Sequence, residues 1–189
     1  MTDVSAYWRN PMFHRAITLK AFAPVLLLAV AAPTATAQPA PSAVSREIAF
    51  LRAFDGQFAG TGSLEHASGS SHRLTCRFTG NSEGRQVLLD GRCSTAIIFG
   101  TSMRIDIQYD AGTGRYSGSF RESMGTIADL AGSRQGQMLS LSFTETPESI
   151  RPNPPARLTI VRRDGGMVLT LRGTKPGRGQ SLNLELRKS

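Results

Sequence analysis

The chain has 189 residues, of which 40% are hydrophobic and 19% are charged. That length supports one well-buried domain and excludes two domains with separate cores of comfortable size. The formal net charge of +8 is carried almost entirely by arginine, because the only lysines are Lys20, Lys175 and Lys188. A basic balance of this kind allows an anionic partner but does not identify one.

The first 37 residues have the pattern of an export signal. A basic stretch from Arg9 to Lys20 precedes the apolar run Ala21–Ala32, and Ala35–Ala37 supplies the small-x-small pattern of a cleavage site. Either Met1 or Met12 would serve as the start. The apolar run is shorter than the ~20 residues of a membrane-spanning helix. We therefore expect a periplasmic or secreted protein with no transmembrane segment in its mature form; the alternative is an uncleaved amphipathic anchor.

The next stretch leads into the folded domain. Residues 38–44 are rich in proline and should stay extended. Phe50, Leu51 and Phe54 follow at helical spacing, which predicts a short amphipathic helix that ends before Asp55 and packs on a sheet or covers one end of it. The expected organisation is a signal peptide over 1–37, a flexible leader over 38–44 and a single β-barrel domain over 45–189.

The pattern from Gln57 to the C-terminus is that of β-strands. Apolar and polar residues alternate along short segments, and glycine-containing turns separate the segments. The turns at Asp110–Arg115 and Asp164-Gly165 predict the opposite pairs Tyr109 and Tyr116, Ile105 and Phe120, Ile160 and Leu169, and Leu158 and Leu171.

The fold class that follows is all-β, an antiparallel up-and-down meander barrel of about 8–10 strands with a short N-terminal helix. A β-sandwich is the alternative, but a closed barrel leaves no exposed strand edges. The proline-rich connection over 144–156 is expected to be a flap over an opening or a surface excursion.

The two cysteines, Cys76 and Cys93, occupy inward positions of neighbouring strands. In an exported protein, a disulfide is the expected state of such a pair. A tight turn at Asn81–Gly84 would set Cys76 opposite Val87 or Leu89 and leave Cys93 too far away. A disulfide would then require a wide loop between the strands or a slip in their register.

A short helix, a first strand marked by Phe58-Ala-Gly-Thr-Gly62 and a hairpin meander together resemble the calycin group of barrels, which includes lipocalins and avidins. The chain is also similar to small exported proteins of proteobacteria that carry two cysteines in their first strands. The lipocalin Gly-x-Trp motif has no match, because the only tryptophan is Trp8. The resemblance implies the architecture, and no ligand-binding residue is transferred from it.

The histidines and carboxylates of the sequence do not form a recognisable metal-binding or catalytic motif. A turn at Ala67–Ser71 would pair Leu64 with Leu74 and His66 with His72; two facing imidazoles are weak candidates for a metal site, and we expect none. The acidic residues Asp90, Asp106 and Asp110 lie at outward positions or in turns. There is no Gly-x-Ser-x-Gly motif and no phosphate-binding glycine loop. We expect no enzymatic activity and no cofactor, with an enzyme of unknown type as a minor alternative.

Positive charge is concentrated near the C-terminus. Residues 151–189 contain nine basic and two acidic residues, whereas residues 38–150 have a net charge of −1. This distribution predicts either a face that attracts anionic polymers or lipid head groups, or a plain solubilising surface. A nucleic acid is not expected, because no surface aromatics alternate with the arginines. The proposed basic face comprises Arg162, Arg163, Arg172, Lys175 and Arg178.

Two functions compete on these patterns. The first is an exported, non-enzymatic barrel that binds an apolar or amphiphilic small molecule, and the inward glycines Gly60, Gly62 and Gly118 favour interior space. The second is an envelope interaction protein with a solid core and a basic C-terminal face. The interior candidates, which equally describe a packed core, are Ile105, Ile107, Tyr109, Tyr116, Phe120, Leu139, Leu141 and Leu169.

Overall fold

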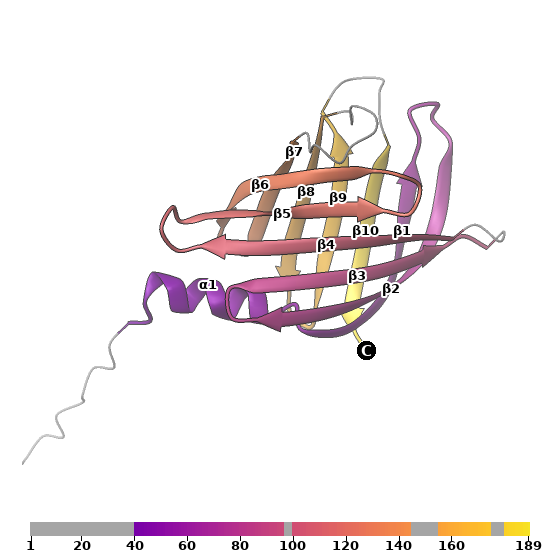
Figure 1. The fold of residues 1–189 in the computed structure, drawn as a ribbon. Coiled ribbons are helices and arrows are strands. Elements are labelled where there is room, and N and C mark those ends of the chain that lie inside the picture. The colour runs from indigo at the N-terminus through magenta and orange to yellow at the C-terminus, as the bar shows by residue number, and fades with distance from the viewer. Residues whose placement is uncertain (1–39, 97–99, 145–154, 175–179) are drawn as a thin grey trace, which may run out of the picture. The chain divides into compact units, whose positions relative to one another are not determined.

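The computed structural model describes residues 40–96, 100–144, 155–174 and 180–189. The described residues form one helix and ten antiparallel strands, which close into a barrel (Figure 1). The elements are α1 (Ala43–Arg52), β1 (Gly56–Glu65), β2 (Ser71–Glu83), β3 (Gln86–Ser94), β4 (Gly100–Asp110), β5 (Arg115–Glu122), β6 (Ile127–Gln135), β7 (Met138–Thr144), β8 (Ala156–Arg163), β9 (Gly166–Gly173) and β10 (Ser181–Lys188).

The barrel is a meander that closes between its first and last strands. Each strand pairs with its neighbour in sequence, and β1 also pairs with β10, where Phe58 lies opposite Lys188 and Leu64 opposite Leu182. The predicted up-and-down barrel is therefore confirmed, and the sandwich alternative is wrong. Closure pairs the backbone groups of both terminal strands, which a sandwich would leave exposed at its edges.

Turn chemistry predicted the later registers correctly. Tyr109 lies opposite Tyr116 with ring centroids 5.2 Å apart, and Ile105 lies opposite Phe120. The turn at Asp164-Gly165 sets Ile160 opposite Leu169 and Leu158 opposite Leu171. Cross-strand pairs of aromatic and branched apolar side chains stabilise a sheet in this way. Residues 145–154 of this connection lie outside the described residues, so the predicted flap stays a prediction.

The first hairpin has a different register from the predicted one. Leu64 lies opposite His72 rather than Leu74, and His66 lies in the loop instead of pairing with His72. The His66 amide donates a hydrogen bond to the Ser70 carbonyl, at 2.9 Å. The loop between the strands therefore runs from His66 to Ser70, one residue earlier in the chain than the predicted turn at Ala67–Ser71.

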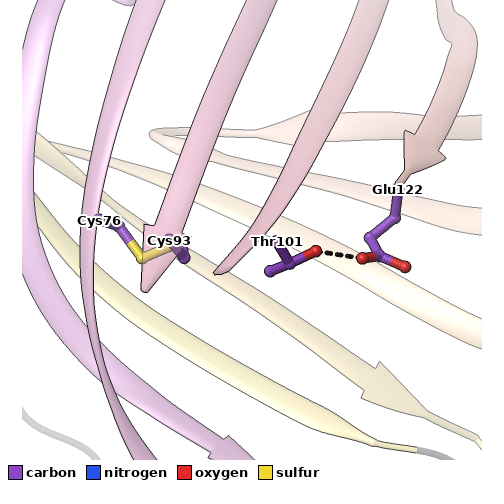
Figure 2. The surroundings of a disulfide bond; sticks show 4 residues. All are labelled: Cys76, Cys93, Thr101 and Glu122. Carbon is purple, nitrogen blue, oxygen red and sulfur yellow. Dashed lines mark hydrogen bonds between the residues drawn. A yellow bond between two sulfur atoms is a disulfide. The ribbon is translucent and has the colours of Figure 1, made fainter. Parts of the chain in front are cut away.

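The predicted turn of the second hairpin is also wrong, and its correction brings the cysteines together. β2 continues to Glu83, and the chain turns at Gly84, whose φ of +54° is the left-handed conformation that glycine adopts readily. Cys76 then lies directly opposite Cys93, with a Cα–Cα distance of 4.1 Å, and the two form a disulfide between β2 and β3 (Figure 2). The expected disulfide is confirmed without a wide loop or a slip.

Inward-facing glycines let the strands approach one another closely. A Cβ at Gly118 would lie 1.8 Å from the backbone oxygen of Asp106, and one at Gly60 would lie 1.9 Å from that of Glu185. At Gly62 the corresponding distance, to the Asn183 oxygen, is 2.0 Å. The prediction that these glycines make room in the interior is wrong, because the backbone of the next strand occupies the space.

Helix α1 lies at one end of the barrel (Figure 1). Its N-cap, Ser42, accepts a hydrogen bond from the Ser45 amide, and its apolar residues Phe50 and Leu51 are buried. The Phe50 ring meets the Tyr116 ring at 6.5 Å, edge to face. No helix in the described ranges has the length and apolarity needed to span a membrane.

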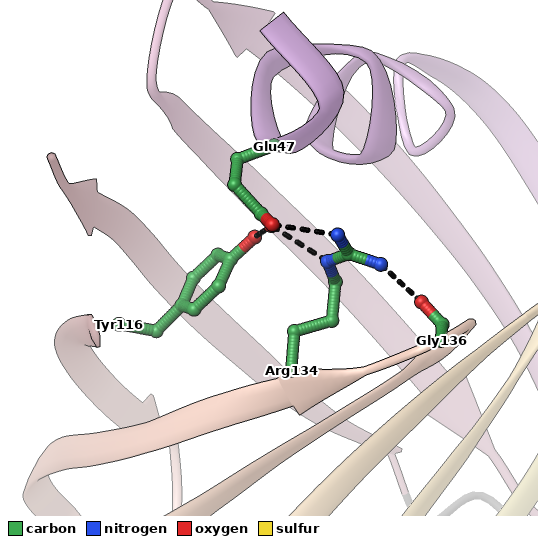
Figure 3. Close-up of polar contacts among 4 residues, drawn as sticks. All are labelled: Glu47, Tyr116, Arg134 and Gly136. Atoms are coloured by element: carbon green, nitrogen blue, oxygen red, sulfur yellow. Dashed lines mark hydrogen bonds and ion pairs between the residues drawn. The ribbon is translucent and has the colours of Figure 1, made fainter. Parts of the chain in front are cut away.

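A polar cluster fixes α1 to the barrel. The Arg134 guanidinium on β6 donates from Nε and Nη2 to the two Glu47 carboxylate oxygens, at 2.6 Å each (Figure 3). The Tyr116 hydroxyl donates to the same carboxylate, and Arg134 also donates to the Gly136 carbonyl. The guanidinium lies 4.8 Å from the centre of the Phe50 ring. The Glu47 carboxylate therefore joins the helix to Tyr116 of β5 and to Arg134 of β6, and Arg134 extends the cluster to the β6–β7 turn.

The cluster shifts the pKa values of its members. The hydrogen bonds from Arg134 hold the pKa of Glu47 below its usual value, against the opposing effect of burial. Burial raises the pKa of the Tyr116 hydroxyl, and the bond to the Glu47 carboxylate raises it further. The ionised pair and the neutral phenol are thus the forms that the fold stabilises.

The Glu47→Gln variant should lose about 2 kcal/mol of unfolding free energy, because it removes charge-assisted hydrogen bonds from a mostly buried site. Urea denaturation at neutral pH measures the loss. Glu185→Gln is the matched control, because Glu185 meets Arg187 at 3.4 Å on the exposed surface, where ion pairs contribute little. Equal losses in the two variants would contradict the assigned role of Glu47.

The same cluster predicts a pH dependence. Because the folded pKa of Glu47 is lowered, its contribution is present at neutral pH and is lost as the pH falls through that folded value. Because the folded pKa of Tyr116 is raised, its contribution declines once the pH rises above about 10, where the unfolded phenol ionises. Chemical denaturation across pH should show both losses, with Glu47→Gln reducing the acid loss and Tyr116→Phe reducing the alkaline one.

Candidate functional site

The predicted interior residues all face into the barrel and are buried. Five of them have no exposed surface, so no water-sized space lies against their side chains. The interior around these side chains is therefore a packed core. These five are Ile105, Ile107, Leu139, Leu141 and Leu169, and the other three, Tyr109, Tyr116 and Phe120, are 7%, 2% and 2% exposed.

The predicted basic residues near the C-terminus lie at two separate places. Arg162 and Arg163 adjoin the β8–β9 turn, whereas Arg172 lies near the far end of β9, opposite Ser181 on β10. At ~3.3 Å per residue, the strand separates Arg163 from Arg172 by roughly 20 Å. Lys175 and Arg178 are outside the described residues. An anion site on these residues stays a prediction.

His66 and His72 do come close, although they are not a cross-strand pair. Their ring centroids are 5.4 Å apart with the rings nearly perpendicular. The part of the chain that the structure describes contains no group of three or more histidine, cysteine, aspartate or glutamate residues arranged to hold a metal ion. The two imidazoles therefore have no third ligand there.

A different set of basic residues gathers on the outer surface of β2 to β5. These arginines alternate with buried residues along their strands, so their side chains point outward. They line an open depression of about 1410 Å³, together with serine and threonine residues of the same strands. We call this surface the arginine face, and its five arginines are Arg73, Arg77, Arg92, Arg104 and Arg121.

The two carboxylates that line the depression are already engaged. Asp90, on the outer face, meets Arg104 at 3.2 Å. Glu122, which has the inward strand parity of Phe120, accepts hydrogen bonds from the Thr101 hydroxyl (Figure 2) and from the Ser123 hydroxyl. In the described ranges, neither Arg77 nor Arg92 has an ion-pair partner, and the same holds for Arg73 on the rim. The face therefore presents positive charge that the protein itself does not neutralise.

The strand register places two arginines of this face directly opposite each other. Arg77 on β2 pairs with Arg92 on β3, and Ala59 and Ser102 are their partners on the outer neighbouring strands. Like charges at opposite positions destabilise a sheet. An anion bound between them would remove that cost, so the pair is suited to binding rather than to stability.

The disulfide lies immediately beside this pair. Cys76 precedes Arg77, Cys93 follows Arg92, and both cysteines are at most 3% exposed. Cys93 also lines the depression. The covalent link therefore holds together the two strands that carry the opposed arginines.

The sequence contained the signal for the arginine face, but charge totals concealed it. Arginines alternate with apolar residues along β2 and β3, which shows that they face outward. The net charge of residues 38–150 is only −1, because the acidic residues of that segment offset these arginines. Only the correct β2–β3 register reveals that Arg77 and Arg92 are neighbours.

Comparisons with known proteins establish the fold and no more. No protein-family model matches the chain, and no curated protein matches it. Among solved structures, it is similar to the crystal structure of Rv2717c from M. tuberculosis, with a TM-score of 0.58 and 11% identity over 76% of this chain and 97% of that one. It also matches the S-type phycobiliprotein lyase CPES from Guillardia theta, with a TM-score of 0.46 and 12% identity over 79% and 99%. The expected calycin-like barrel is confirmed as a fold.

Replacing both cysteines, as in Cys76→Ala with Cys93→Ala, should lower the free energy of unfolding by about 3 kcal/mol, because the disulfide closes a loop with a sequence separation of 17. Urea denaturation with and without reductant measures this. The reductant should destabilise the natural protein and leave the double variant unchanged. A natural protein that is equally stable in both conditions would contradict the role given to the disulfide.

Proposed function

We propose that this barrel is an exported, non-enzymatic binding protein of the bacterial envelope that holds an anionic partner on its arginine face. The observation that carries the proposal is the directly opposed pair Arg77 and Arg92, which lacks a carboxylate partner in the described chain and lies in an open depression. An unneutralised cluster of this kind raises the local concentration of anions and speeds their association.

The disulfide and the sequence of the N-terminus support the envelope as the place of action. Buried disulfides persist in oxidising compartments such as the periplasm and are rare in the cytosol. The basic and apolar segments before Gln38 have the order of an export signal. Envelopes of bacteria offer anionic polymers and lipid head groups, to which a basic protein surface is attracted.

The competing hypothesis is an apolar or amphiphilic ligand inside the barrel. It receives less support, because the side chains that would line the site pack against one another and α1 closes one end through Glu47 and Arg134. A ligand would have to displace core side chains or release the helix. A fluorescent apolar probe that binds the natural protein and the Arg77→Glu, Arg92→Glu variant equally would favour the interior hypothesis.

Charge reversal tests the arginine face directly. The variant Arg77→Glu with Arg92→Glu should lose binding to immobilised dextran sulfate, and binding of the natural protein should weaken steeply from about 50 mM to about 300 mM NaCl. Because both side chains are exposed, the variant should keep the thermal stability of the natural protein.

The matched control is Arg162→Glu with Arg163→Glu, which makes the same change in net charge at the β8–β9 turn. It should retain binding within about threefold, because screened charges at a distance contribute little. Loss of binding in the control with retention in Arg77→Glu, Arg92→Glu would move the site to the C-terminal arginines. Absence of salt-sensitive binding in the natural protein would overturn the proposal.

A further inference from the structure

We infer that Arg77 and Arg92 form a subsite for a phosphomonoester group, an inference that rests on the proposed function and specifies its ligand. The two residues project outward from adjacent strands at the same level of the ladder. Opposite residues in an antiparallel pair alternate between close and wide spacing, so next to the close Cys76–Cys93 pair the Cα atoms of Arg77 and Arg92 lie about 5.5 Å apart. Two guanidinium groups can therefore reach one ligand.

The chemistry of two opposed arginines favours phosphate over carboxylate. Each guanidinium is a planar fork that donates two parallel hydrogen bonds to an oxyanion. A carboxylate has two oxygens and one charge, which one fork already satisfies. A phosphomonoester has three terminal oxygens and a charge of about −1.5 to −2 at neutral pH, so it can engage both forks.

The surroundings add donors of the right kind. Thr75 and Ser94 lie opposite each other two positions along the ladder from the arginine pair, on the same outer face, and both line the depression. Their hydroxyls can donate to phosphate oxygens that the guanidinium groups leave free. The site therefore combines charge, forked donors and hydroxyl donors.

The other arginine pair of the face is less suited to this role. Arg104 lies opposite Arg121, but Asp90 lies opposite Arg104 on its other side and binds it at 3.2 Å. A phosphate there would have to compete with a carboxylate of the protein. The Arg77–Arg92 pair also has the adjacent disulfide, which holds its two strands together and lowers the ordering cost of binding.

The test compares ligands that differ in the phosphate group. The mature chain is titrated with phosphatidylcholine vesicles that contain either phosphatidic acid, a phosphomonoester, or phosphatidylglycerol, a phosphodiester, at matched surface charge. Phosphatidic acid should bind about tenfold more tightly. Glycerol 3-phosphate in solution distinguishes the sources: competition by millimolar glycerol 3-phosphate shows that a free phosphate suffices, and binding to vesicles alone shows that the lipid head group is required. Either result supports the phosphomonoester site.

A charge-conserving variant separates fork recognition from simple attraction. Arg77→Lys with Arg92→Lys should retain dextran sulfate binding within about threefold and lose the preference for phosphatidic acid, because lysine is a point charge without a fork. Arg162→Lys with Arg163→Lys is the control and should keep the preference. Equal binding of the two lipids by the natural protein, or a preference that survives in Arg77→Lys, Arg92→Lys, would overturn the inference. Retained dextran sulfate binding would then leave the proposed function standing.

Discussion

The pairing of β1 with β10 is the constraint on which the rest of the structure depends. It turns a meander with two open edges into a closed barrel and fixes the inward face of every strand. Closure at this strand number is possible because glycines lie where strands cross closely, as at Gly60 and Gly118, whose missing side chains leave room for the neighbouring backbone. The glycines thus serve the curvature of the sheet and not the capacity of the interior.

The close packing of the interior side chains weighs against a ligand inside the barrel. With the core filled and one end held by the Glu47–Arg134 pair, the outer surface offers the accessible chemistry. The arginine face lies over β2 to β5, and its opposed residues Arg77 and Arg92 have no ion-pair partner in the described part of the chain. Similarity of fold to Rv2717c at 11% identity carries no information on a ligand, so the proposal of an anion on the barrel wall rests on the arginine face itself.

The sequence predicted what depends on local pattern. The alternation of apolar and polar residues, together with the two-residue turn at Asp164-Gly165, was enough to predict the pairing of Ile160 with Leu169. A two-residue turn that contains glycine leaves few possible registers for the strands that flank it. The β2–β3 register was missed because Asn81 and Gly84 both suit a turn, and moving the partner of Cys76 by four residues, from Leu89 to Cys93, keeps the same face inward. The Glu47–Arg134 pair was not predictable, because the residues are far apart in the sequence and each occurs in an ordinary polar position. The sequence also did not predict that Arg77 lies opposite Arg92, because this pairing follows from the β2–β3 register.

The closing pair of strands has a consequence for how the chain folds. In the described part, every other strand pairing joins neighbours along the chain, but β1 and β10 are separated by nearly the whole domain. The entropy lost in closing a loop grows with its length, so this pairing is the costliest to form and gains most from having the meander already in place. Until it forms, β1 and β10 are free edges. The outward residues Asn183, Glu185 and Arg187 give β10 a polar, charged edge, which opposes pairing with a second chain during that interval.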